Sequence, residues 1–335
     1  MISLMYYFSC LGLLFSLHTQ NGTPEWINHP ERSYPNSQYL TAIGTGDSRK
    51  EAENSAASNL AKIFQSKIKS EETINARYQE LIKSNQSSLE SRTNIEKKIS
   101  VASEQTLFNV RYPESYTDNL GKVFVLGIIE REPTAVLYRD KIKENYSRIE
   151  SFVKKCEKVK DPLKKYSNID AALVTAKVNV ALVQQLKIIM IGMSVQPDSA
   201  YSLGRITEMC SNAQKDVSFA INISGAEKDN VAGFINDMLS ELGFSVAERG
   251  VLTIGGTESV ERIDLASDQK FVRWSYQLFV NEASGRTIIS FSENGREGHI
   301  TYEEAAARAL RTMREKIKTD LGEKINSYFN SLAMK

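Results

Sequence analysis

A pair of glycines before a predicted helix start is the first pattern in the chain that could form a binding site. Gly44-Thr45-Gly46 follows a β-prone run, and Ser48 and Glu51 then form the S-x-x-E pattern of a helix N-terminus. Backbone N–H groups of a glycine-rich loop at such a place can bind a phosphate. The third glycine of the dinucleotide fingerprint is missing, because position 49 is Arg, and Walker spacing is absent. The pattern favours a tight strand-to-helix turn.

A second candidate lies near the C-terminal end, where His299 and Glu303 are four residues apart at a predicted helix start. Two metal ligands at this spacing can share a helical face. The other two histidines, His18 and His29, lie near the start of the chain, so further ligands would have to be carboxylates. We favour a surface turn with N-terminal helix charge. If the segment is functional, we expect Arg296, His299 and Glu303 to contact a partner or an anionic glycan.

Three cysteines, Cys10, Cys156 and Cys210, are too few for a disulfide framework, and no Cys/His spacing indicates zinc. Cys156 and Cys210 fall on apolar helical stripes, which favours small core residues over a redox pair. Nucleophile-elbow and zinc-protease motifs are absent, and no paired carboxylates stand on matching elements. We therefore predict a protein that is not an enzyme, with no catalytic, cofactor-binding or metal-binding residues and no cofactor.

The composition excludes one large class of partner. The 335 residues include 42 Lys and Arg against 41 Asp and Glu, a formal net charge of +1. A nucleic-acid binder carries a basic excess, so we expect no nucleic-acid partner. The length suffices for one large core or two ordinary ones.

The chain opens with an apolar segment. Residues 5–17 carry no charge and are too short to span a bilayer as a helix, but they fit the h-region of a secretory signal. No Lys or Arg precedes Arg32, so the usual positive n-region is missing. We predict a signal-like leader over residues 1–23 and a membrane association through this leader or a lipid anchor alone.

Cys10 is a lipidation candidate. Ser9 suits a lipobox, whereas Tyr7 departs from it and the apolar run continues through Leu17. Cleavage after the leader without lipid is the competing interpretation, and Cys10 is then an ordinary apolar leader residue.

The elements that would position these residues follow from periodicity. Residues 38–43 predict a strand, with a helix after Ser48 whose apolar face includes Ala52, Ala56 and Leu60. Small alanines allow this helix to approach a sheet closely. We favour long antiparallel strands for residues 70–103, and predict strands at 107–112 and 122–129 joined by a hairpin turn at residues 118–121.

Residues 133–214 predict a helical connector. One helix carries a stripe from Ile142 to Cys156 and ends at Asp161-Pro162, a second covers about 169–191, and a third begins at Pro197-Asp198. The remaining chain predicts strands at 217–223, 244–247, 251–254, 271–280 and 287–291, with helices at 229–242 and 301–332.

The last helix repeats features of the first. Thr301 and Glu304 form a second S/T-x-x-E pattern, and Ala305 and Ala309 follow at four-residue spacing. An internal duplication would explain this, and so would the common needs of any helix that lies on a sheet. The pattern leaves both open.

Residues 24–131 resemble the LPP20 lipoprotein family of bacterial envelope proteins. The motifs are Pro24-x-Trp26, the strand and turn Y-L-T-A-I-G-T-G of residues 39–46, the helix with Glu51-Ala52 and Ala56, and the strand of residues 123–130. The resemblance implies an outer-membrane or periplasmic location and a role in surface assemblies, and it brings no catalytic residues.

We therefore predict an α+β protein with two small domains, each a helix packed on a mainly antiparallel sheet, joined by a helical connector. The expected limits are a leader at 1–23, an LPP20-like domain at 24–132, the connector at 133–214 and a C-terminal domain at 215–335. The leading hypothesis is a structural or adaptor protein of a cell-envelope assembly, with envelope proteins or copies of itself as partners. The alternative is a binding module for peptidoglycan or another envelope polymer.

Overall fold

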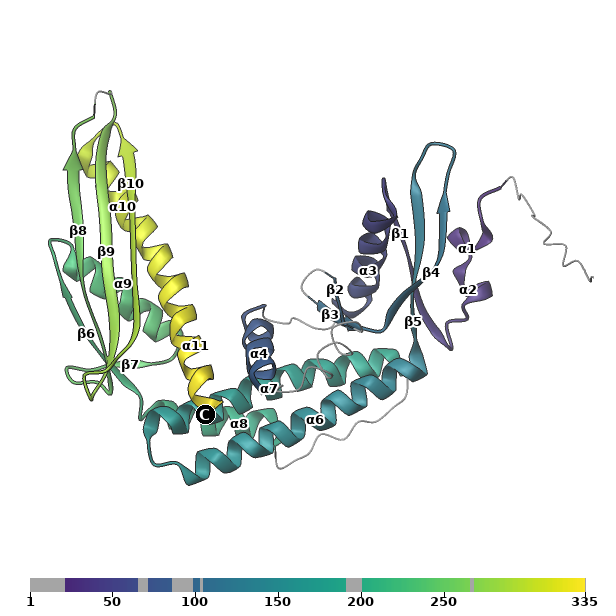
Figure 1. Cartoon of the computed structure of the whole chain (residues 1–335), viewed down its shortest axis with the longest axis horizontal. Helices are drawn as coiled ribbons and strands as arrows, with labels where there is room; N and C mark the ends of the chain where they lie inside the picture. The colour runs from purple at the N-terminus through teal and green to yellow at the C-terminus, as the bar shows by residue number, and fades with distance from the viewer. Residues whose placement is uncertain are drawn as a thin grey trace, which may run out of the picture. The chain divides into compact units, whose positions relative to one another are not determined.

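A computed structural model describes residues 22–65, 72–85, 99–102, 105–190, 201–265 and 268–334 (Figure 1). The leader with Cys10 lies outside the described residues. The chain divides into two compact units. The first holds the residues up to Ile63 and Asn109–Arg131, and the second holds Phe64–Phe108 and Glu132–Lys335. The second unit thus includes both the expected connector and the expected C-terminal domain, and the exact domain limits stay a prediction.

The first unit is built on a three-stranded antiparallel sheet. Its order is β1-β5-β4, from β1 (Tyr39–Gly46), β4 (Val110–Thr117) and β5 (Val123–Glu130). Two short helices, α1 (Glu25–Asn28) and α2 (Pro30–Ser33), precede it. The predicted hairpin turn is confirmed, because the Asp118 carboxylate accepts hydrogen bonds from the N–H groups of Leu120 and Lys122, both at 2.9 Å.

Helix α3 (Arg49–Gln65) packs unusually close to this sheet. A Cβ atom on Gly44 would lie 2.1 Å from both the Ala52 carbonyl oxygen and the Ala56 nitrogen. On the neighbouring strand, a Cβ on Gly127 would lie 3.1 Å from Ala56 Cβ and from Leu60 Cδ1. The expected close approach is confirmed. The predicted turn at Gly44 and Gly46 is wrong, since both are paired residues of β1 opposite β5.

The capping pattern explains where α3 begins. Ser48 Oγ accepts from the N–H of Glu51 at 3.3 Å, and Glu51 Oε2 accepts from the N–H of Asp47 at 2.9 Å. These two bonds satisfy one free N–H group of the first turn and one just before the helix, and they fix where α3 begins.

The region expected as long strands contains a helix instead. Helix α4 covers Glu72–Asn85, and the strands described nearby are β2 (Ile99–Ala102) and β3 (Gln105–Phe108), which form a short antiparallel pair. Tyr78, Leu81 and Ile82 are buried on α4 at helical spacing. This stripe was hidden among polar residues, which is why the strand prediction failed.

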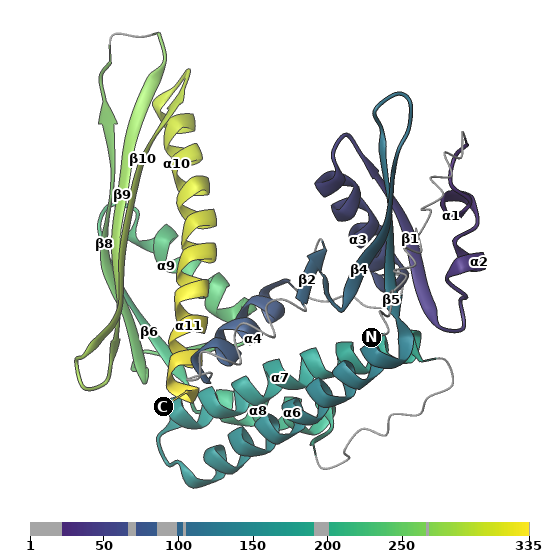
Figure 2. The ribbon, with the colours of Figure 1, turned by 45° about the vertical axis from the view of Figure 1, so that its right-hand side comes forward.

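Three helices form the part expected as a connector: α6 (Arg131–Lys158), α7 (Pro162–Ile189) and α8 (Leu203–Gln214). Helices α6 and α7 lie side by side (Figures 1 and 2). The predicted break is confirmed, since Asp161 caps α7 by accepting from the N–H groups of Leu163 and Lys164. Pro197 and Asp198 lie outside the described residues, and the described helix α8 begins at Leu203 behind its cap Ser202.

Among the described residues, α7 is the one helix long and apolar enough to cross a membrane. Half of its most apolar window is buried within the structure. Its buried residues include Asn168, Asp170, Asn179 and Gln185, which make polar contacts inside the unit or lie enclosed there. We therefore describe α7 as a core helix of the second unit.

The C-terminal part has a five-stranded mixed sheet of order β10-β9-β8-β6-β7. The strands are β6 (Ser218–Ser224), β7 (Ser245–Val246), β8 (Leu252–Ile263), β9 (Lys270–Glu282) and β10 (Thr287–His299). The three long strands pair antiparallel, whereas β6 is parallel to both β7 and β8. The predicted α+β class is confirmed. The order differs from that of the first sheet, so the likeness of the two capped helices does not extend to strand order.

The helices of this part lie along one side of the sheet (Figure 2). Helix α9 (Lys228–Glu241) packs on β6, and α10 (Tyr302–Lys316) packs on β9 and β10. A π-helical segment, Ile317–Leu321, joins α10 to α11 (Gly322–Ala333), so the long predicted helix is confirmed with a wider turn inside it. The core includes edge-to-face and stacked aromatic contacts among Phe219, Phe244, Tyr166 and Phe329.

Candidate interaction surface

Helices cover one face of the C-terminal sheet, and the two faces therefore differ in how far their side chains are exposed. Along β9, Trp274, Tyr276 and Leu278 are 2% exposed or less, because they point to the helices. The alternate residues Arg273, Gln277 and Phe279 are exposed. We call this second side the outer face.

The outer face is polar with a single exposed aromatic ring. The strand register places three rows across β8, β9 and β10 on this face. Two rows are polar, Ser259 with Ser275 and Asn294, and Thr257 with Gln277 and Ser292, and the third row is Gly255, Phe279 and Ser290. The Phe279 ring covers Gly255, where an added Cβ would lie 2.5 Å from the ring. Short hydroxyl and amide groups beside an exposed ring suit recognition of another molecule better than burial in a core.

The next row carries like charges that face each other. Arg273 and Arg296 are direct cross-strand partners on β9 and β10. Glu261 is the partner of Arg273 on β8, but its carboxylate accepts from Ser259 Oγ at 2.9 Å and forms no ion pair within the described ranges. Like charges directly opposite destabilise a sheet. An anion bound here would remove that cost.

Arg296 has one further contact. Its guanidinium lies 5.3 Å from the centre of the Phe271 ring, a cation–π contact that leaves its N–H groups free to donate. Neither Arg273 nor Arg296 forms an ion pair within the part of the chain that the structure describes.

The acidic residues of β10 point the other way. Glu293 accepts from Lys316 Nζ at 3.3 Å, and Glu297 accepts from Thr312 Oγ1 at 2.9 Å, so both carboxylates are held by α10. The strand thus separates its charges. Carboxylates face the helix and the arginine faces solvent.

The structure separates the two residues of the metal-ligand spacing. His299 is the last residue of β10, whereas Glu303 lies in α10, so they share no helical face. The surface turn that we favoured is wrong, because the residues up to His299 continue β10 and pair with β9. His299 Nδ1 lies against Glu304, and Glu303 accepts from Arg262 at 3.4 Å. No group of three or more potential metal ligands occurs among the described residues. The role of Arg296, His299 and Glu303 as partner contacts stays a prediction.

Both cysteines of the body are buried and free, as expected from their helical stripes. Burial, with the nearby Asp170 carboxylate, raises the pKa of the Cys210 thiol to about 12. Burial also raises the pKa of Cys156. Cys156 borders a shallow depression of about 430 Å³ that Met209 and Lys165 also line.

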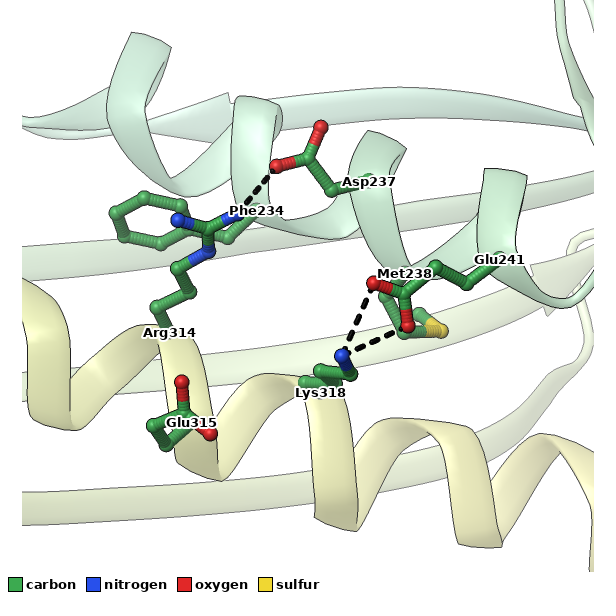
Figure 3. A pocket seen from close by; sticks show the side chains of 7 residues that line it. All are labelled: Phe234, Asp237, Met238, Glu241, Arg314, Glu315 and Lys318. Carbon is green, nitrogen blue, oxygen red and sulfur yellow. Dashed lines mark hydrogen bonds and ion pairs between the residues drawn. The ribbon is translucent and has the colours of Figure 1, made fainter.

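A second, narrow cleft of about 100 Å³ lies between α9 and α10 (Figure 3). Arg314 donates to Asp237 at 2.9 Å, and Lys318 pairs with Glu241 at 2.8 Å. The Arg314 guanidinium also lies over Phe234. This space is far smaller than ordinary ligand pockets, and its polar groups already pair with one another. We conclude that these residues join two helices.

A buried polar cluster holds α4 to the rest of the second unit. The Arg77 side chain, 13% exposed, pairs with Asp170 of α7 and donates to Asn330 of α11 at 3.0 Å. Asn330 in turn donates to Glu80 at 2.6 Å. Tyr78 donates to Asn145 of α6 at 2.7 Å. Charged groups removed from water need such partners, so the cluster fixes the position of α4.

Sequence reasoning named Arg296 but missed its neighbours. The sequence pattern places Arg273 and Phe279 in a strand but does not give their neighbours on β8 and β10, because those depend on register. The available signal is the alternation of apolar with mostly polar residues along 271–280.

The comparisons with known proteins define the class of the first region. Residues 24–128 match the LPP20 lipoprotein family, which confirms the predicted resemblance. This N-terminal region is therefore of the LPP20 lipoprotein type, and the family indicates a location in the bacterial cell envelope. A search of curated proteins finds no match.

Three solved structures are similar at low identity. A secreted protein from Helicobacter pylori matches at 14% identity and a TM-score of 0.41, over 85% of this chain and 97% of its own. A minor lipoprotein from Acinetobacter baumannii matches at 12% identity and a TM-score of 0.26, over 34% and 92%. A putative lipoprotein from Caulobacter crescentus matches at 13% identity and a TM-score of 0.23, over 34% and 88%.

Proposed function

We propose that this envelope protein is a non-catalytic adaptor that binds other proteins of a cell-envelope assembly through the outer face of its C-terminal sheet. One observation carries the proposal. The helices cover one face of the sheet, and Phe279, Gln277 and Arg273 are exposed on the other face, where no described element of the second unit covers them. Antiparallel sheets tolerate a solvated face, but an exposed ring and free arginines are typical of interfaces.

The proposal includes a location. As an adaptor with an LPP20-type N-terminal region, the protein would work in the periplasm or at the outer membrane. Its leader, a lipid on Cys10 or its partners would hold it there.

The test is the size of the complexes that the protein forms. We expect the tagged chain, released from native envelopes with mild detergent, to migrate as discrete species larger than a monomer. Phe279→Ser combined with Gln277→Lys should shift it to monomer size. Arg311→Glu, an exposed change on α10, should leave the complexes intact. A wild-type chain of monomer size, or complexes that survive the outer-face change, would contradict the proposal.

A second candidate function is peptidoglycan binding, favoured by the hydroxyl and amide rows beside Arg296. Stem-peptide carboxylates would then pair with the arginines. This function predicts that the purified protein sediments with isolated cell wall and that Arg296→Ala abolishes sedimentation. A wall-free supernatant containing all of the wild-type protein would exclude it.

A further inference from the structure

The free edge of β10 lies beside the unpaired arginines. Strand β10 is the last strand of the sheet, paired with β9 on one side only. It runs over 13 residues, Thr287–His299. Alternate residues of an edge strand point their N–H and C=O groups away from the sheet. Such a row can pair with another extended chain.

Little of this edge is occupied. The Gly298 carbonyl accepts from Arg308 Nη1 at 3.4 Å. Apart from that bond, no hydrogen bond from an element other than β9 reaches the backbone of β10 in the described part of the chain. Most of the backbone edge of β10 is therefore unpaired within the described residues.

Charge determines which chain would fit. On the outer face, the side chains of an added strand would lie next to Ser290, Ser292, Asn294 and Arg296 of β10. Arg296 and Arg273 form two adjacent positive charges there, while Glu293 and Glu297 are turned to α10. An acidic residue on the added strand would lie beside Arg296 and offset the repulsion between Arg296 and Arg273.

We propose that β10 accepts an extended, acidic segment of a partner protein as a sixth strand, with a carboxylate of that segment paired with Arg296, the arginine nearest the free edge. This inference rests on the proposed adaptor function and names the kind of partner. The backbone edge supplies affinity, and the arginine pair selects acidic sequences.

The experiment uses the full chain and a library of short synthetic peptides whose alternate residues are Asp or Glu, with Val and Thr between them. Fluorescence anisotropy should detect binding by members of the library. Peptides with Lys in place of the acids should not bind. Arg296→Glu should weaken the best peptide by at least about tenfold, as expected for loss of a close charge pair. Arg311→Glu is the matched control on α10 and should change little.

Methylated peptides separate strand pairing from simple charge attraction. Methyl groups on alternate backbone nitrogens block one edge of an extended peptide and leave the other edge free. We expect one of the two methylated series to lose binding and the other to keep it.

The proposal would be overturned if no acidic peptide bound, or if Arg296→Glu and Arg311→Glu weakened peptide binding equally. Binding by both methylated series would also contradict it. So would displacement of the peptide by inorganic phosphate or soluble cell-wall fragments at the peptide's own concentration. If envelope complexes still depend on Phe279 and Gln277 in that case, the adaptor function stands and only the partner's chemistry is wrong.

Discussion

Single residues decide how closely α3 lies on the first sheet. Gly44 faces backbone atoms of the helix, not the ends of flexible side chains, so nothing near it can move aside cheaply. The Y-L-T-A-I-G-T-G motif is thus a packing requirement. The sequence shows the glycines, but glycine is favoured both in a turn and at a close backbone contact. The pairing of β1 with β5 distinguishes the two roles.

Gly44→Ala should therefore destabilise the protein by at least about 2 kcal/mol, because the new Cβ overlaps backbone of α3. Scanning calorimetry of the full chain should show a lower Tm for one transition. Gly204→Ala is the matched control, since nothing lies within 4 Å of its added Cβ. Equal behaviour of the two variants would show that α3 can move away from the sheet.

The cysteines allow a second prediction at this scale. Because burial and Asp170 raise the pKa of Cys210 to about 12, only about one thiol in ten thousand is ionised at pH 8. We expect Cys210 and Cys156 to resist thiol reagents in the native protein and to react at once in denaturant. Rapid labelling of Cys210 under native conditions would indicate that α8 opens readily.

At the scale of elements, the parts with clear periodicity were predicted well. The helices at 228–241 and 302–333 follow from apolar spacing and capping residues. The hairpin of β9 and β10 was expected too, but β10 runs to His299 and not only to residue 291. Its second half was missed because the polar residues after Phe291 show no apolar alternation.

Helix α4 was missed because its short buried stripe of Tyr78, Leu81 and Ile82 is flanked by polar residues, some of which find partners on other helices. From the sequence alone, Arg77 is expected at the surface. The structure shows that Asp170 and Asn330 bind its side chain inside the second unit.

Helix α4 should depend strongly on its buried ion pair. Asp170→Asn leaves the Arg77 charge enclosed without its counter-ion, and we expect a loss of about 3–5 kcal/mol in the free energy of unfolding. Urea denaturation followed by circular dichroism measures it. Glu150→Gln removes an exposed ion pair with Lys154 on α6 and should cost less than about 1 kcal/mol.

Replacing both partners tests the cause. Arg77→Met together with Asp170→Leu removes the buried charges instead of orphaning one, and it should recover most of the stability lost in Asp170→Asn. A double variant as unstable as the single one would mean that shape, not charge, holds α4 in place.

At the scale of the whole molecule, the family resemblance indicates the location, and the fold indicates the candidate interaction surface. The N-terminal region carries the LPP20 motifs and with them the envelope location. The candidate interaction surface lies in the other unit, outside the matched residues, where sequence patterns gave strands but not their order. The pairing of Arg273 with Arg296 depends on the register of β9 with β10, which no local pattern specifies.

The most direct test of the adaptor account is photo-crosslinking in living cells from a reactive amino acid placed at position 277, on the outer face. We predict adducts with one or a few discrete envelope proteins. The same amino acid at position 311, exposed on α10, should give none. The absence of adducts from position 277, or the same adducts from both positions, would contradict the claim that this face of the sheet binds the partners.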